Sequence, residues 1–349
     1  MKKTVTVKAG STVRRAGTLL AAAALMAVAG CGGQTTDPNG NVGNEDSRPD
    51  SARKQTQEDS QADEAPGQVF AVSAKGDERV RLRYRPDQGA KRHIDLGVDI
   101  GLTTTLNGEK QPTLDMPRFV VHGDYRIVKV ADDGSFTQEL TLSEWTLDSE
   151  AESEGGLGAE ERKALEQALE SIGAMRSTTT LSPRGEVLDV AVDLPENAPA
   201  QVQSMLEEFK GQLANLQAPL PEEPVGVGST WQSKNTLTLA EASFGKLDWD
   251  TAYRYRLKKI DGNRITIAVT YVQKAVPAEL KDPDRPDTSG EITGGNVKGS
   301  GTIVVDLGLG AVTEGSLQAD GTMDMTLKSG DQSGEVHYDL SYAFDIGGH

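Results

Sequence analysis

The sequence contains few side chains whose types and spacing could support chemistry. It has one cysteine, Cys31, and four histidines, and no two histidines have the spacing that places two metal ligands on one helix face. The motifs of zinc proteases, serine hydrolases and nucleotide-binding loops are also missing from the sequence. We interpret His93 and His122 as strand histidines with ordinary hydrogen-bond partners. We therefore predict a protein that is not an enzyme, with no catalytic residues, no cofactor and no metal site.

Two acidic segments are the remaining candidates, as calcium ligands. Oxygen-bearing side chains alternate from Asp37 to Asn41, but Val42 stands where a calcium loop needs glycine, and the closing glutamate is absent. The second segment, from Asp282 to Glu291, has carboxylates at mixed spacing with prolines between them. We favour a polar linker for the first segment and a solvated loop for the second, with calcium binding as the alternative in each case.

The composition limits the classes of protein to consider. The chain of 349 residues has 36 basic and 53 acidic side chains, a formal net charge of −17, which disfavours binding to nucleic acid. A single cysteine disfavours a disulfide-stabilised domain. Hydrophobic residues make up 36% of the chain, below the roughly 45–50% of a typical globular domain, so part of the length is expected to lie outside a packed core.

The N-terminus has the architecture of an export signal. Five basic residues and no acidic ones fall within residues 1–15, and an apolar run of small residues follows from Ala16 to Gly30. A spanning helix needs about 20 apolar residues, so this run is too short for a permanent transmembrane anchor. We predict a signal peptide over residues 1–30. Arg14 and Arg15 leave the twin-arginine export route open beside the general secretory route.

The end of this signal resembles the lipobox of bacterial lipoproteins. The four residues are Val28, Ala29, Gly30 and Cys31, with small residues directly before the cysteine. The resemblance implies cleavage between Gly30 and Cys31, transfer of a diacylglyceryl group to the cysteine thiol, and acylation of the new amine. Such a lipid anchors a protein to a membrane without spanning it. Gly32 after the cysteine resembles the default that directs lipoproteins of Gram-negative bacteria to the outer membrane of the cell envelope.

Residues 31–67 form a different kind of segment after the signal. They are mostly Gly, Asn, Asp, Ser, Gln and Thr, with hardly an aliphatic side chain. Such a segment cannot bury enough apolar area to offset its loss of backbone entropy. We predict a disordered tether that joins Cys31 to the folded domain, with a reach of roughly 30–36 Å.

Residues 68–349 are predicted to form one β-rich domain. Apolar and polar residues alternate over short stretches, as in Val80 to Arg85 and Tyr253 to Lys258, which is the pattern of half-buried strands. Two hairpins have turn residues between alternating segments, one around Gly134 and one around Gly262. Similar features recur in the same order, which indicates two related halves at about 80–195 and 222–345. The alternative is that β-rich chains of this composition resemble one another.

Two segments between the halves have the period of amphipathic helices. One lies near 158–173 with Leu165 and Leu169 on its apolar face, and the other near 199–217 with Val202, Leu206 and Phe209. The predicted fold class is therefore α+β, predominantly antiparallel β: a curved open sheet or half-barrel, with two helices between two repeated β halves. Helices packed over such a sheet could enclose an apolar ligand, and these five residues are its candidate contacts.

A resemblance to known families supports this outline. The segment from Pro221 to Trp231, taken with the turn from Ser182 to Glu186, resembles an uncharacterised family of bacterial lipoproteins over about residues 80–327. More remotely, the predicted architecture is similar to that of the LolA and LolB carriers, which implies an acyl chain or lipoprotein tail held between sheet and helices. No residue matches a functional motif of those carriers, so no site is transferred.

Two function classes follow from the sequence. The first is a non-enzymatic, membrane-anchored envelope lipoprotein that binds an apolar ligand. The second is a structural or surface-interaction lipoprotein with a filled core, and an enzyme is a third alternative. The expected partners are the membrane, through the covalent lipid, and a lipid or lipoprotein ligand, but not nucleic acid.

Overall fold

The computed structural model describes residues 69–111, 114–115, 117–147, 160, 162–163, 166–167, 175–193, 217–241, 245–281, 288–329 and 332–347. The predicted signal peptide and tether lie outside these residues. In this part of the chain, fifteen strands pair into one sheet, and every pairing between them is antiparallel. The strands are β1 (Val69–Ser73), β2 (Lys91–Leu106), β3 (Glu109–Lys110), β4 (Leu114–Asp115), β5 (Phe119–Val130), β6 (Phe136–Leu147), β7 (Met175–Leu181), β8 (Val187–Asp193), β9 (Thr230–Glu241), β10 (Gly245–Asp261), β11 (Arg264–Ala275), β12 (Ala278–Lys281), β13 (Thr288–Asp306), β14 (Ala311–Ser329) and β15 (Gln332–Gly347).

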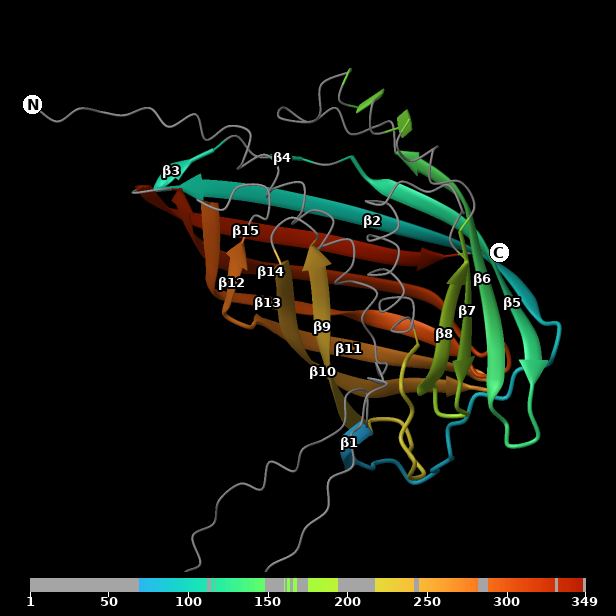
Figure 1. The fold of residues 1–349 in the computed structure, drawn as a ribbon. Coiled ribbons are helices and arrows are strands. Elements are labelled where there is room, and N and C mark those ends of the chain that lie inside the picture. The colour runs from blue at the N-terminus through green and yellow to red at the C-terminus, as the bar shows by residue number, and fades with distance from the viewer. Residues whose placement is uncertain are drawn as a thin grey trace, which may run out of the picture.

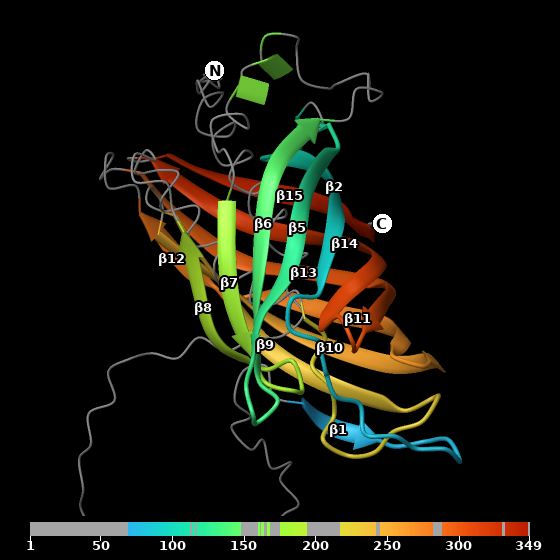
Figure 2. The same ribbon diagram turned by 90° about the vertical axis from the view of Figure 1, so that its right-hand side faces the viewer.

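The sheet is open, with β1 at one end and β8 at the other. Its order is β1-β9-β10-β11-β13-β14-β15-β2-β5-β6-β7-β8, and the short strands β3, β4 and β12 pair beside this path. The sheet is strongly twisted, because β6 to β8 run steeply across the direction of β13 to β15 (Figure 1). The turned view places β5 to β8 in front of those long strands (Figure 2). The last strand, β15, pairs with β2 and so joins the strands from β9 to β14 to the strands from β5 to β8 at the middle of the sheet.

Alternation along each strand gives the sheet one apolar and one polar face. On β10, Tyr253, Tyr255 and Leu257 are buried, whereas Arg254 and Arg256 between them are exposed. This period of two is the strand pattern expected from the sequence. We call the face with the buried side chains the inner face and the opposite one the outer face.

The two hairpins expected from their turn residues are present. Gly134 lies between β5 and β6 with φ of 82°, and Gly262 lies between β10 and β11 with φ of 59°. A residue with a side chain is disfavoured in this left-handed region, so glycine suits both tight turns. The strands β9-β10-β11-β13-β14 lie on one side of β15 in the sheet, and the strands β2-β5-β6-β7-β8 lie on the other side. A duplication of two halves remains a prediction from the sequence.

Glycines in β13 have a packing role on the inner face. A Cβ atom built on Gly299 would lie 2.2 Å from the ring of Tyr271 on β11, so the ring occupies the space above the glycine. Tyr271 in this position donates a hydrogen bond of 3.1 Å to the hydroxyl of Tyr342 on β15, three strands further along the sheet. A glycine inside a strand often marks a bulge or a bend. Gly299 instead continues the regular pairing of β13 with β11 and β14.

The predicted α+β class is wrong. Strands hold 73% of the described residues and helical residues 2%, and no described segment forms a helix of the fold. Five described residues of the segment near 158–173 are helical, with an i, i+4 ion pair of 3.2 Å between Arg162 and Glu166. An apolar stripe indicates helix propensity, but a short helix is marginal without extensive packing. The predicted helix near 199–217 lies outside the described residues except for Gln217.

The alternating segment from Val80 to Arg85 is extended but is not a strand of the sheet. Leu82 and Tyr84 are buried as the alternation predicts. The backbone N–H groups of Tyr84 and Arg85 donate to the carbonyls of Pro183 and Leu307, so the segment bonds to loops at the hairpin ends. Alternation predicts which side chains are buried, but it does not predict which part of the chain forms the backbone hydrogen bonds. For this segment the partners are loop residues and not a strand.

Candidate functional site

Two three-residue segments with the same pattern meet on the outer face. β2 contains His93 and Asp95, β5 contains His122 and Asp124, and each segment has the form His-x-Asp. The antiparallel register pairs His93 with Asp124 and Asp95 with His122. Because residues two apart on a strand point to the same face, all four side chains share the outer face. We call these four residues the two-histidine cluster.

The imidazoles of the two-histidine cluster converge on one carboxylate. Asp95 Oδ1 lies 2.6 Å from His122 Nδ1 and 3.3 Å from His93 Nε2. The other ring nitrogen of His93, Nδ1, lies 3.3 Å from Asp124 Oδ1. The two imidazole rings are nearly parallel, at 13°, with centroids 6.2 Å apart. The side chains of His93, Asp95 and His122 are 46%, 36% and 32% exposed, so solvent and solutes can reach them.

A related group lies further along the outer face, on β14 and β15. His337 Nδ1 is 2.7 Å from Asp324 Oδ1, and its Nε2 is 3.4 Å from Asp339 Oδ1. We call these three residues the one-histidine cluster. The hydrogen bond to Asp324, together with the negative charges of Asp324 and Asp339, raises the pKa of His337 above its usual value. Each nitrogen of this single ring meets a different carboxylate.

An arginine near the start of β5 lies between the clusters. Arg118 forms ion pairs with Asp99 on β2 and, at 3.0 Å, with Asp345 on β15. A Cβ atom built on Gly97 would lie 2.2 Å from a guanidinium nitrogen of Arg118, so the absence of a side chain at position 97 makes room for it. This arginine neutralises two carboxylates on the outer face, Asp99 and Asp345, and neither belongs to a histidine cluster.

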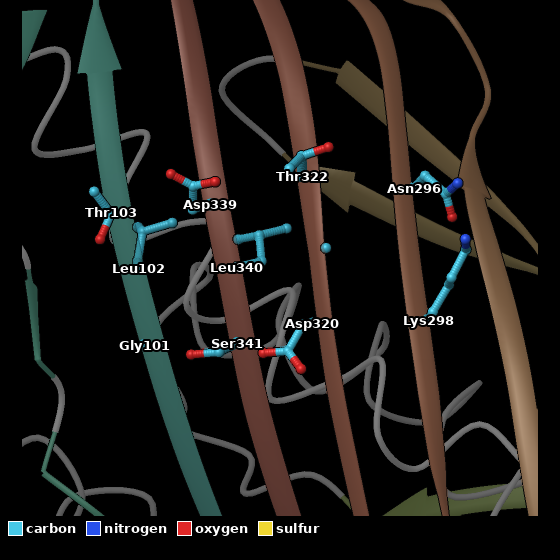
Figure 3. A pocket seen from close by; sticks show the side chains of 11 residues that line it. Gly101, Leu102, Thr103, Asn296, Lys298, Asp320, Thr322, Asp339, Leu340 and Ser341 are labelled. Atoms are coloured by element: carbon cyan, nitrogen blue, oxygen red, sulfur yellow. The ribbon is translucent and has the colours of Figure 1, made fainter.

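The outer face also has two open depressions. The first, of about 620 Å³, follows a row in which Thr103, Asp339, Thr322 and Asn296 pair across β2, β15, β14 and β13, with Lys298 beside the row (Figure 3). The second, of about 490 Å³, is lined by residues that include Asp324, Glu335 and His337. The one-histidine cluster therefore lies where the two depressions adjoin, since Asp339 lines the first and His337 the second.

Among the residues that the structure describes, one group has three side chains placed to share a metal ion. The nearest ligand atoms of His93, Asp95 and His122 all lie within 4.8 Å of one another. Imidazole nitrogen with carboxylate oxygen is a donor set that suits zinc and neighbouring transition metals. The sequence by itself predicts no metal site, because each histidine is isolated within its own strand.

The signal that was missed is the repetition of one short pattern. His-x-Asp occurs at 93–95, 122–124 and 337–339, and two copies in antiparallel strands can place each histidine opposite an aspartate. The pattern alone does not give the register of β2 with β5. The two strands are separated by a connection with its own short pairings, β3 and β4.

The site residues predicted from the sequence are not among those that the structure describes. Gly30 and Cys31, the predicted cleavage and lipidation residues, are outside the described residues, as are the candidate ligand contacts Leu165, Leu169, Val202, Leu206 and Phe209. The acidic segment from Asp282 to Asp287 is outside them as well.

Comparison with known proteins gives no family. No protein-family model matches the chain, and no curated protein matches it. OmpF of Salmonella typhi in complex with daunomycin is 11% identical, with 73% of this chain and 98% of that chain covered and a TM-score of 0.20. A mutant of the Rh. blastica porin is 9% identical, with 73% and 100% covered and a TM-score of 0.20. An outer membrane channel from Pseudomonas putida F1 is 10% identical, with 78% and 99% covered and a TM-score of 0.12.

Scores this low carry no argument about fold or function. The β-rich nature of the chain rests on its own strands. Within the described residues, no helix has both the length and the apolar character needed to cross a bilayer.

Proposed function

We propose that the protein is a lipid-anchored lipoprotein of the cell envelope whose β domain is a non-enzymatic scaffold for surface interactions. The observation that supports the lipid anchor is the segment from Val28 to Cys31, which follows a basic and then apolar N-terminus. The net charge of −17 also supports attachment by lipid, since an acidic chain is not drawn to anionic membranes. In a Gram-negative cell, Gly32 after the cysteine favours the outer membrane.

The geometry favours the filled-core scaffold over the carrier of an apolar ligand. Inner-face side chains such as Ile267, Tyr255 and Trp231 are fully buried in the folded chain. The two depressions described above are open to solvent and are lined mainly from the outer face by polar and apolar groups alike, so neither is an enclosed apolar pocket. A carrier needs an apolar pocket for an acyl chain. The carrier hypothesis therefore stays a prediction from the sequence and has no support from a pocket in the described part of the chain.

The anchor is tested with a Cys31→Ser variant expressed in the native host. We expect the wild-type protein to incorporate labelled palmitate and to remain in the membrane fraction. The variant should lose the label and either leave the membrane or accumulate as an uncleaved precursor. A processed variant that stays in the membrane without label would contradict the proposal.

The filled core is tested with a pair of neighbouring substitutions on β11. Ile267→Ala removes a fully buried side chain and should lower the free energy of unfolding by about 2–5 kcal/mol. The matched Thr266→Ala, on the outer face, should change it by less than about 0.5 kcal/mol. Chemical denaturation measures both values. If Ile267→Ala leaves stability unchanged but releases a lipid seen by native mass spectrometry, the carrier hypothesis replaces the scaffold.

A further inference from the structure

We propose that His93, Asp95 and His122 form a binding site for a divalent transition-metal ion, with zinc as the probe. The inference rests on the geometry of the two-histidine cluster and does not depend on the lipid anchor or on the scaffold function. The ligand atoms are His93 Nε2, Asp95 Oδ1 and His122 Nδ1, because these are the atoms that converge.

The spacing of these atoms fits a shared ion. Zinc binds imidazole nitrogen and carboxylate oxygen at about 2.0–2.2 Å, so two ligands at a tetrahedral angle lie about 3.3 Å apart. His93 Nε2 and Asp95 Oδ1 are 3.3 Å apart. His122 Nδ1 and Asp95 Oδ1 are closer, at 2.6 Å, a hydrogen-bond distance. Binding replaces the proton of that hydrogen bond with the ion, and the two half-exposed side chains separate by under about 1 Å.

The outer contacts of the cluster also fit a metal site. A histidine that binds a metal through one nitrogen usually donates its other N–H to a carboxylate, which fixes the ring and its tautomer. Asp124 Oδ1 lies 3.3 Å from His93 Nδ1 and so supplies this contact. His93 is thereby left with Nε2 facing Asp95 and His122. Asp124 is a positioning residue that acts through His93.

The donor set identifies the chemical class of the ion. Calcium and magnesium prefer six or more oxygen ligands, whereas this cluster offers two nitrogens and one oxygen. Three protein ligands leave a fourth tetrahedral position, which faces solvent because the three side chains are partly exposed. The site therefore resembles an accessible ion-binding site more than a closed structural one.

The rival explanation is that the cluster is only a set of cross-strand hydrogen bonds. The one-histidine cluster offers the matched control, because it has the same residue types and the same outer-face setting. His337 presents a single ring to two different carboxylates. Each nitrogen of this ring lies near a different carboxylate, so the ligand atoms of these three residues do not converge on one point.

The experiment is a calorimetric titration of the full chain with zinc, using protein that has no histidine tag. Wild type and His337→Asn should bind the same number of zinc equivalents, and His122→Asn should bind one fewer. Calcium and magnesium at the same concentrations should give no binding at this site. Cys31 is common to all three proteins, so the state of its sulfur does not affect the difference in zinc equivalents.

Circular dichroism checks that each variant is folded, and His93→Gln replaces His122→Asn if the latter is not. The proposal is overturned if His122→Asn and His337→Asn bind zinc alike, because the cluster is then a hydrogen-bonded array only. The proposal is also overturned if His337→Asn binds one zinc equivalent fewer than the wild type and His122→Asn does not.

Discussion

The two histidine clusters of the outer face contain the same three-residue pattern, His-x-Asp. They differ in the residues of the neighbouring strand that pair with this pattern. On β2 and β5, two His-x-Asp segments pair antiparallel, so the rings of His93 and His122 share the carboxylate of Asp95. On β14 and β15, a single His-x-Asp segment faces Asp324, so two carboxylates share the one ring of His337. Residue types alone therefore do not define a metal site. The number of ligand atoms that converge on one point does.

The largest expected difference between the clusters is in stability with zinc. A bound ion stabilises the folded state by about 2.7 kcal/mol when free zinc is about 100-fold above its Kd. We expect this gain in the wild type, reversed by a chelator, and its loss in His122→Asn. His337→Asn should retain it. Thermal unfolding with and without zinc measures the difference, and equal gains in both variants would remove the distinction between the clusters.

A second prediction is that the one-histidine cluster can be converted into the other kind. The triple variant combines Asp324→His, His337→Asp and Asp339→His. The new carboxylate at position 337 then lies opposite a histidine at 324 and two residues from a histidine at 339. Asp95 has the same relation to His122 and His93. The triple variant should bind one more zinc equivalent than the wild type, because three ligands now converge. Calorimetry counts the equivalents. A folded triple variant with unchanged stoichiometry would show that register and residue type are insufficient.

A smaller effect is expected at the positioning residue. Asp124→Asn keeps the size of the side chain but removes the charge that orients His93. Loss of such a contact weakens metal binding by about 10–100-fold. The stoichiometry should stay the same while the Kd for zinc rises. An unchanged Kd would mean that Asp124 has no part in the site.

The smallest effect concerns protons at the one-histidine cluster. The hydrogen bond to Asp324 and the nearby charges raise the pKa of His337 in the folded chain above its unfolded value of about 6.5. Its stabilising contribution is therefore fully present below about pH 6.5 and is lost as the pH rises through the higher folded pKa. The group is partly exposed, so the contribution is below about 1 kcal/mol. The difference in unfolding free energy between wild type and His337→Asn, measured against pH without metal, should follow this course. A difference that grows with pH would contradict it.

Local patterns in the sequence predict much of the sheet. The turn residues around Gly134 and Gly262 give the two hairpins, and alternation from Tyr253 to Lys258 gives the inner and outer faces of β10. These features are local, because the turn and the period of two depend on neighbouring residues. The helix near 158–173 was predicted from the same kind of pattern, but an apolar stripe shows only that a helix could form.

The candidate site was not predicted, because it depends on contacts between distant segments. His93 and His122 meet only through the register of β2 with β5, and the one-histidine cluster through that of β14 with β15. The period of two places each histidine on the correct face but does not determine which strand lies beside it. Gly299 is a similar case, since its role depends on Tyr271 from β11 lying above it.

The most direct test of the zinc site is a crystal structure of the full chain grown with zinc, with anomalous data collected at the zinc absorption edge. The account predicts an anomalous peak between β2 and β5, with His93 Nε2, His122 Nδ1 and an oxygen of Asp95 each about 2.0–2.2 Å from the ion. The contrary result is a map with no peak at these three residues, or a peak at His337 in their place.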